Sequence, residues 1–216
     1  MRGLLIKDFQ LVKNQKTTLF IFLAISLVML LSQWTYFSFV FGFLTFSGLI
    51  FTIGTLSYDE FQNGLSFLMT LPIQRKHYVQ EKYLFGWILI TIFCFFSLIL
   101  AIFGANYQGE VLSIHDWIIM TGMVYVWFLF FFSCMLPVQL KFGPTNNNAP
   151  MFIVMAVFAL CIYLIYQVGL WCGIDFMLVL DSLEPLMLLG MMILITCITW
   201  YISYRISCYI IEKREF

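Results

Sequence analysis

The chain has 216 residues, of which 62% are hydrophobic, 19% are aromatic and 10% are charged, and its mean hydropathy is +0.97. Soluble domains carry about 25% charged residues, so this composition excludes an ordinary soluble protein and indicates an integral membrane protein. The 11 basic and 11 acidic residues give a formal net charge of zero, and no nucleic-acid partner is expected.

The first 16 residues, MRGLLIKDFQLVKNQK, have the pattern of an amphipathic helix. Leu5, Phe9 and Val12 share one helical face, and polar side chains occupy the opposite face. We expect an interfacial helix at residues 1–16 that lies parallel to the membrane plane. Because a second apolar segment follows the first directly, without an evident cleavage site, the first is expected to be a retained span rather than a signal peptide.

Long uncharged segments follow this helix. A membrane-spanning helix needs about 20 predominantly apolar residues, and six segments meet this requirement. We place the spans near residues 18–35, 37–56, 84–104, 117–138, 150–170 and 185–205. The predicted fold is therefore an all-α integral membrane protein, with six transmembrane helices in one transmembrane domain that covers residues 1–216.

The basic residues predict the orientation of these spans. They all fall in segments that share one side of a six-span arrangement: Arg2, Lys7, Lys13, Lys16, Arg75, Lys76, Lys82, Lys141, Arg205, Lys213 and Arg214. Cytoplasmic segments carry the excess of Lys and Arg in membrane proteins. We therefore expect both termini and the polar segment at residues 57–83 to lie in the cytoplasm. The predicted outer loops carry only acidic charges.

Small residues recur along the predicted second span at steps of three or four. They are Ser38, Gly42, Thr45, Gly48 and Thr52. This spacing places them in one stripe, where another helix can approach closely. We interpret the stripe as a packing surface within the helix bundle; a subunit interface and a translocation path are the alternatives.

The polar segment at residues 57–83 is predicted to contain a short helix. Ser57, followed three residues later by Glu60, has the form of a capping box, which predicts a helix start after Ser57. Pro72 is expected to end that helix and to begin a second one, which carries Arg75 and continues into the third span. The segment is therefore expected to be a helix, a break and a helix that enters the membrane.

The short helix is predicted to be amphipathic and to contact a protein. Phe61, Leu65 and Leu68 share its apolar face with Tyr58. No basic residue occurs between residues 57 and 74, which favours a protein partner over an anionic lipid surface. Gly64 costs a helix interior about 1 kcal/mol relative to Ala, so its presence indicates a close backbone approach or a bend.

Catalytic and metal-binding residues are not expected in this chain. No Asp, Glu, Lys, Arg or His lies near the middle of a predicted span, which argues against a proton-driven transporter. The two histidines, His77 and His115, are predicted on opposite sides of the membrane, and the six cysteines lack paired spacing. A P-loop motif is absent from the sequence, so energy for transport would come from a partner.

The residues Tyr58, Asp59, Glu60 and Gly64, followed by LMTLPIQRKHYVQEKYL, resemble the pattern of ABC-2 type transporter permeases. The opening MRGLLIKDFQLVK and the ending IIEKREF resemble those of the small six-span permeases of that family. The resemblance implies a permease subunit that pairs with a second copy or a paralogue. It also implies a separate cytoplasmic P-loop ATPase, which would hold ATP and Mg.

The resemblance further implies a coupling helix between spans two and three, at about Tyr58–Leu71, with the N-terminal helix as a connecting helix beside it. The residues expected to couple the permease to the ATPase are Glu60, Phe61, Gly64, Leu65, Leu68, Pro72 and Arg75.

The expected function is therefore that of a membrane-embedded exporter subunit, not an enzyme, in a bacterial plasma membrane. Its cargo would be amphipathic or antimicrobial peptides or other hydrophobic molecules. A stand-alone channel or scaffold is the alternative, although no spaced rings of polar or charged residues support a pore. A membrane enzyme is a second alternative, although no acidic, His or Cys groups converge at one interface.

Overall fold

The computed structural model describes residues 2–31, 37–60, 64–70, 74–109, 113–142, 149–171 and 184–214. Every regular element in these ranges is a helix, as the sequence predicts. The helices are α1 (Arg2–Asn14), α2 (Lys16–Leu31), α3 (Phe37–Glu60), α4 (Gly64–Thr70), α5 (Arg75–Gln108), α6 (Ile114–Phe142), α7 (Ala149–Trp171) and α9 (Pro185–Lys213).

Four of the described helices are each long and apolar enough to cross a membrane: Ser38–Asp59 of α3, and α5, α6 and α9. The pair α1 and α2 also meets the criteria, but the two helices are bent by 61° at their junction. The described residues thus contain four candidate spans by length and composition, or five if the bent pair is one span. The six-span arrangement and the side on which the termini lie stay predictions.

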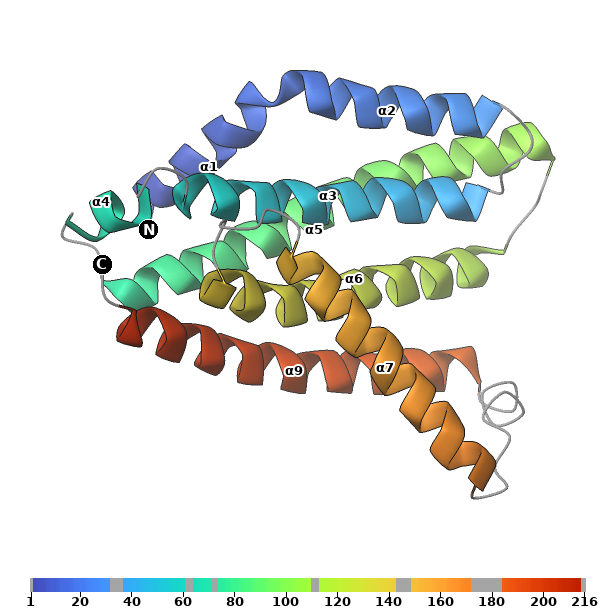
Figure 1. The fold of residues 1–216 in the computed structure, drawn as a ribbon. Helices are drawn as coiled ribbons and strands as arrows, with labels where there is room; N and C mark the ends of the chain where they lie inside the picture. Colours follow the sequence, from blue (N-terminus) through green and yellow to red (C-terminus); the bar gives the residue numbers. More distant parts are fainter. Residues whose placement is uncertain are drawn as a thin grey trace.

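The long helices form a bundle whose two ends differ (Figure 1). The N-terminus, the C-terminus and α4 lie at one end, where α5 begins and α9 stops. Arg214 near the end of the chain donates to the carbonyl oxygen of Leu140 at 3.1 Å, which places the C-terminal part of α6 at this end too. We call it the basic end, because the described Lys and Arg side chains of these helix termini gather there.

Packing within the bundle is dominated by two helix pairs. Helix α3 packs along α5, and α6 packs along α9. Their common core draws on all four helices. It includes Leu49 of α3, Tyr78 of α5, Phe132 and Leu140 of α6, and Ile211 of α9. Helix α7 runs obliquely to the others in Figure 1 and contacts α6, where Phe158 packs edge-on against Trp127 at 5.7 Å between ring centroids.

The stripe of small residues on α3 divides into two parts. Thr45, Gly48 and Thr52 are buried, and the hydroxyl groups of Thr45 and Ser97 of α5 lie 3.0 Å apart. A Cβ atom added at Gly48 would lie 3.0 Å from Phe93 of α5. Ser38 is exposed, and a Cβ atom at Gly42 would meet no heavy atom within 4 Å. The buried part therefore packs against α5.

Polar side chains also join α5, α6 and α9. The Tyr83 hydroxyl lies 2.5 Å from the Ser203 hydroxyl and 3.0 Å from that of Ser207. Ser203 in turn donates to the carbonyl oxygen of Ser133. All four residues are buried. Because a buried hydroxyl without a partner is destabilising, these bonds favour one relative position of the three helices.

Gly86 of α5 faces α6 closely. A Cβ atom at this position would clash with the ring of Phe132, a side chain with 1% exposure. Gly86→Ala should therefore lower the thermal stability of the protein in detergent, because overpacking typically costs about 1–3 kcal/mol and exceeds the roughly 1 kcal/mol that Ala adds to a helix interior.

Gly54→Ala is the matched control, since a Cβ atom at Gly54 meets nothing within 4 Å. It should leave stability unchanged or raise it slightly. Adding Phe132→Leu to Gly86→Ala should recover part of the loss. Equal stability of the two single variants would contradict the close packing of α5 on α6.

Candidate coupling site at the basic end

The end of α3 lies further along the chain than the sequence predicts. Helix α3 continues through Ser57 to Glu60. The Ser57 hydroxyl donates to the carbonyl oxygen of Ile53 at 3.2 Å and accepts a hydrogen bond from Gln139 of α6 at 3.2 Å. The prediction of a helix start after Ser57 is therefore wrong, because its hydroxyl bonds back to the preceding turn instead of capping a new helix.

The separate helix is the seven-residue α4, which begins at Gly64. A Cβ atom at Gly64 would lie 2.7 Å from the carbonyl oxygen of Asp59. This is the close backbone approach that the sequence indicates, although Gly64 lies at the helix start rather than in its middle. Only a residue without a side chain permits this spacing unless the backbone shifts, so Gly64 keeps α4 against the end of α3.

Helix α4 has an inner and an outer face. Leu65 is 3% exposed and belongs to the same buried cluster as Leu56 and Tyr78, and Leu68 is partly buried against that cluster. Phe67, in contrast, is 68% exposed. The two leucines that the sequence places on the apolar face therefore attach α4 to the bundle, and Phe67 is a large apolar side chain that α4 presents outward.

The other predicted coupling residues lie around α4. Glu60 is the last residue of α3, and its side chain is not described; Phe61 and Pro72 lie outside the described residues. Arg75 is the first residue of α5, and its guanidinium donates to the carbonyl oxygens of Ile211, Glu212 and Arg214 at 3.1, 2.7 and 3.1 Å. Arg75 thus supplies hydrogen bonds to the carbonyl groups left unpaired at the end of α9.

A buried group of charges joins α1, α3 and α5 beneath α4. Lys82 of α5 forms ion pairs with Asp8 of α1 and with Asp59 of α3, the latter at 2.7 Å. Lys7 of α1 also pairs with Asp59, and it lies 3.3 Å from Asp8. Tyr78 donates a hydrogen bond to Asp59 at 3.2 Å. We call Lys7, Asp8, Asp59 and Lys82 the charge cluster.

Burial makes this cluster dependent on all its members. The side chains of Asp8, Lys82 and Asp59 are 0%, 2% and 4% exposed, whereas that of Lys7 is 31% exposed. Moving a charge out of water costs several kcal/mol, and a buried ion pair recovers this cost only while both partners are present. Two lysines and two aspartates balance within the cluster, so its formal charge is zero.

Glu81 adds a further acidic group beside the cluster. The residue is 2% exposed, and neither carboxylate oxygen has a hydrogen-bond partner within the described part of the chain. An uncompensated carboxylate at such a position is unfavourable. All four members of the charge cluster act electrostatically on Glu81. With Glu81 included, this region contains three acidic and two basic side chains.

The charge cluster was not predicted from the sequence. Asp59 appears in the family resemblance, and Lys7 appears on the polar face of the first helix, but nothing in the spacing pairs them. The bonds join residues 52 and 74 positions apart. The available signal is that three helix termini at one end carry charged residues next to an apolar segment, acidic on α3 and of both signs on α1 and α5. This signal does not identify the partners.

A bundle of long apolar helices defines a multi-pass membrane protein. The sequence model of a family described as "ABC-2 family transporter protein" matches residues 3–212. The chain therefore belongs to the ABC-2 transporter family, as its motifs indicate, and is a permease component of an ABC transporter. No match was found among characterised proteins or among solved structures.

Family membership also defines the general role of the chain. An ABC-2 permease is a membrane transport component and is not itself catalytic. Membership of the family implies an ATPase partner for the complete transporter. Within the described residues, no group of three or more His, Cys, Asp or Glu side chains could hold a metal ion.

Lys82→Met should lower the free energy of unfolding by about 3–5 kcal/mol, because it removes the buried one of the two lysines that pair with the aspartates and leaves a surplus buried negative charge. Lys76→Met is the matched control on the same helix. Lys76 is 65% exposed and pairs with Glu212 at 3.4 Å, and an exposed pair contributes about 0–1 kcal/mol. Denaturation in mixed detergent micelles measures both variants.

A double-mutant cycle with Asp8→Asn separates pairing from a general packing defect. The loss in Asp8→Asn/Lys82→Met should be smaller than the sum of the two single losses, because the double variant no longer leaves a surplus charge. Additive losses would show that Asp8 and Lys82 act independently and would refute the cluster.

Arg75→Gln should loosen the last turn of α9. A hydrogen bond to a charged donor contributes about 1.5–3 kcal/mol, so hydrogen exchange of the backbone amides at residues 208–214 should accelerate by about tenfold or more. His77→Gln, an exposed substitution on the same turn of α5, should leave this exchange unchanged. An unaffected α9 in Arg75→Gln would exclude the capping role.

Proposed function

We propose that this chain is the membrane-spanning subunit of an ATP-driven exporter, and that α4 is the coupling helix on which the ATPase acts. The observation that carries the proposal is the two-sided structure of α4. Leu65 and Leu68 attach it to the core, and Phe67 remains 68% exposed at the basic end. A short helix that is attached on one face and apolar on the other suits the transfer of force from a docked protein.

The proposed orientation places the basic end in the cytoplasm. The described basic residues lie at helix termini of this end, which also holds both chain termini (Figure 1). Lys and Arg are enriched on the cytoplasmic side of membrane proteins. The ATPase, with its ATP and Mg, would then approach α4 from the cytoplasm, and Glu60 and Phe61 at the junction would extend the docking surface.

Movement of α4 would reach the membrane through three connections. Gly64 holds its start against the Asp59 carbonyl, and Leu65 holds its body in the core. Asp59 belongs to the charge cluster, so α1 and α5 would follow. Arg75, at the start of α5, is bonded to the end of α9. Displacement of α4 would therefore shift several helices together as a rigid-body movement rather than bending a single loop.

The proposed cargo is an amphipathic peptide, such as an antimicrobial peptide, or another hydrophobic molecule. The central thirds of the long helices contain no Asp, Glu, Lys, Arg or His, and a path of this kind favours apolar ligands. Transport would require a dimer of two copies, or of this chain and a paralogue, in a bacterial plasma membrane. A stand-alone channel or scaffold is the competing function and is separated by the next experiment.

Phe67→Ala should reduce recovery of the ATPase with the tagged permease by at least about tenfold, because truncation of a central aromatic anchor typically costs about 2 kcal/mol or more. The measurement is co-purification from native membranes in a mild detergent. Phe142→Ala is the matched control, since Phe142 is 50% exposed at the end of α6.

Three outcomes separate the possibilities. Loss of the ATPase in Phe67→Ala but not in Phe142→Ala supports α4 as the docking helix. Undiminished recovery of the ATPase by both variants would mean that the outer face of α4 is not the contact with the ATPase. A wild-type chain that purifies without any ATPase, although the ATPase is present in the lysate, would overturn the exporter and favour a channel or scaffold.

A further inference from the structure

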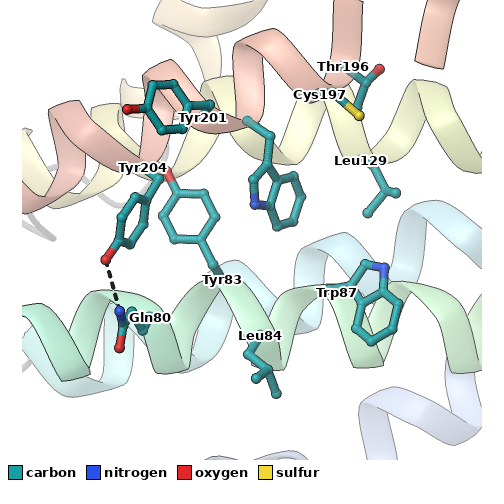
Figure 2. Close-up of a pocket in the computed structure, with 10 residues that line it drawn as sticks. Gln80, Tyr83, Leu84, Trp87, Leu129, Thr196, Cys197, Tyr201 and Tyr204 are labelled. Carbon is teal, nitrogen blue, oxygen red and sulfur yellow. Dashed lines mark hydrogen bonds between the residues drawn. The ribbon is translucent and has the colours of Figure 1, made fainter. Parts of the chain in front are cut away.

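A groove opens on the side of the bundle between α5 and α9, away from α4. It has a volume of about 600 Å³, within the range of about 300–1,000 Å³ usual for small-molecule sites. Figure 2 shows its wall, to which α5 contributes Tyr83, Leu84 and Trp87 and α9 contributes Cys197 and Tyr201. The exposed side chains of this wall are predominantly apolar or aromatic.

The groove has one polar end. Gln80 donates a hydrogen bond to the Tyr204 hydroxyl at 3.0 Å (Figure 2). Towards the opposite end lie Trp87 and Cys197, and Leu129 of α6 contributes to the wall. The polar end is the one nearer the basic end of the bundle, because Gln80 is close to the start of α5 and Tyr204 is close to the end of α9.

Helix length places this polar end near the membrane surface. Helix α5 has 34 residues and α9 has 29, which correspond to about 51 and 43 Å at 1.5 Å per residue. The hydrocarbon core is about 30 Å thick, so both helices extend beyond it. The apolar part of the groove then faces acyl chains, and the tyrosines at its polar end lie at the depth where aromatic side chains are enriched.

Basic side chains continue the groove beyond its polar end. Arg205 lies one helical turn beyond Tyr201 and is exposed, and no acidic side chain of the described chain forms an ion pair with it. Lys76 lies one turn before Gln80, although it is paired with Glu212 at 3.4 Å. The spacing of one turn puts each on the face of its helix that borders the groove.

We propose that this groove binds a phospholipid with an anionic headgroup from the adjacent leaflet. One acyl chain lies along Trp87 and Leu84, and the headgroup phosphate contacts Arg205. The apolar wall, the aromatic rim and the cationic end occur in the order in which a phospholipid presents its chain, its glycerol region and its charge. The site does not depend on α4 or on an ATPase, so it stands apart from the proposed transport function.

A soluble peptide or a neutral hydrophobic molecule fits the groove less well. Neither requires a cation at the surface end, and the side of the groove opens where lipid surrounds the bundle. An anionic headgroup pairs with Arg205, and the attraction of anionic lipid to a basic side chain at the surface is a general property of membranes. The bound lipid would connect α5, which begins at the coupling site, with α9.

Tryptophan quenching tests the proposal in the intact protein. The full chain is placed in nanodiscs of phosphatidylcholine. One sample contains a small, fixed fraction of phosphatidylglycerol brominated on its acyl chains, and the other contains the same fraction of brominated phosphatidylcholine. Brominated phosphatidylglycerol should quench the tryptophan fluorescence more strongly than brominated phosphatidylcholine. Competition with phosphatidylglycerol that carries no bromine should reveal a preference of about fivefold for phosphatidylglycerol over phosphatidylcholine, as expected for one basic side chain at a membrane surface.

Variants identify the source of the excess quenching. Trp87→Phe/Trp200→Phe should remove it, since both tryptophans line the groove, and the remaining tryptophans report the general lipid environment. Arg205→Gln should abolish the preference for phosphatidylglycerol. Lys141→Gln, which removes an exposed basic residue at the end of α6, should preserve it.

Three results would overturn the proposal. Equal quenching by the two brominated lipids would mean that the groove does not recognise an anionic headgroup. An excess that persists in Trp87→Phe/Trp200→Phe would place the anionic lipid elsewhere on the protein. Retention of the full preference in Arg205→Gln would remove the proposed headgroup contact.

Discussion

The structure of the basic end depends on one buried interaction, the pairing of Lys82 with Asp8 and Asp59. These charges come from three helices that also meet through apolar contacts, such as the edge-on packing of Phe9 against Phe85 at 5.2 Å. Apolar contacts tolerate small shifts, whereas a buried charge loses its compensation when its partner moves away. The cluster therefore helps to fix the relative position of α1, α3 and α5. Helix α4 is held against the end of α3 through Gly64.

A second set of bonds gives α9 a corresponding position. Arg75 bonds the end of α9 to the start of α5, and Tyr83 meets Ser203 and Ser207 two turns further along. Together with the charge cluster, these bonds make α5 the helix to which the other parts of the basic end are attached. An input at α4 and a lipid between α5 and α9 would thus act on the same helix from opposite sides.

The sequence predicts the helices well because long apolar segments have few alternatives in a membrane. The cost of glycine in a helix indicates a close approach or a bend at Gly64, and the structure has the close approach. The sequence does not show which way the leucines of α4 point, since helical periodicity places Leu65 and Leu68 on one face without saying what that face meets. Ser57 has the spacing of a capping box, yet its hydroxyl donates a hydrogen bond to the Ile53 carbonyl oxygen on the preceding turn of α3. The charge cluster joins residues far apart in the chain, and one sequence carries no information on such pairs.

The wide separation of the cluster's members also sets an order on assembly. Helix α1 is synthesised before α3 and α5, which carry Asp59 and Lys82, the partners of Lys7 and Asp8. Once the end of α3 has been made, Lys7 can pair with Asp59, but Asp8 gains its pairing with Lys82 only after the first turns of α5 have followed. Contacts of this sequence separation form late because the intervening chain must first be ordered. Helix α1 therefore cannot complete its ion pairs until α5 has been made.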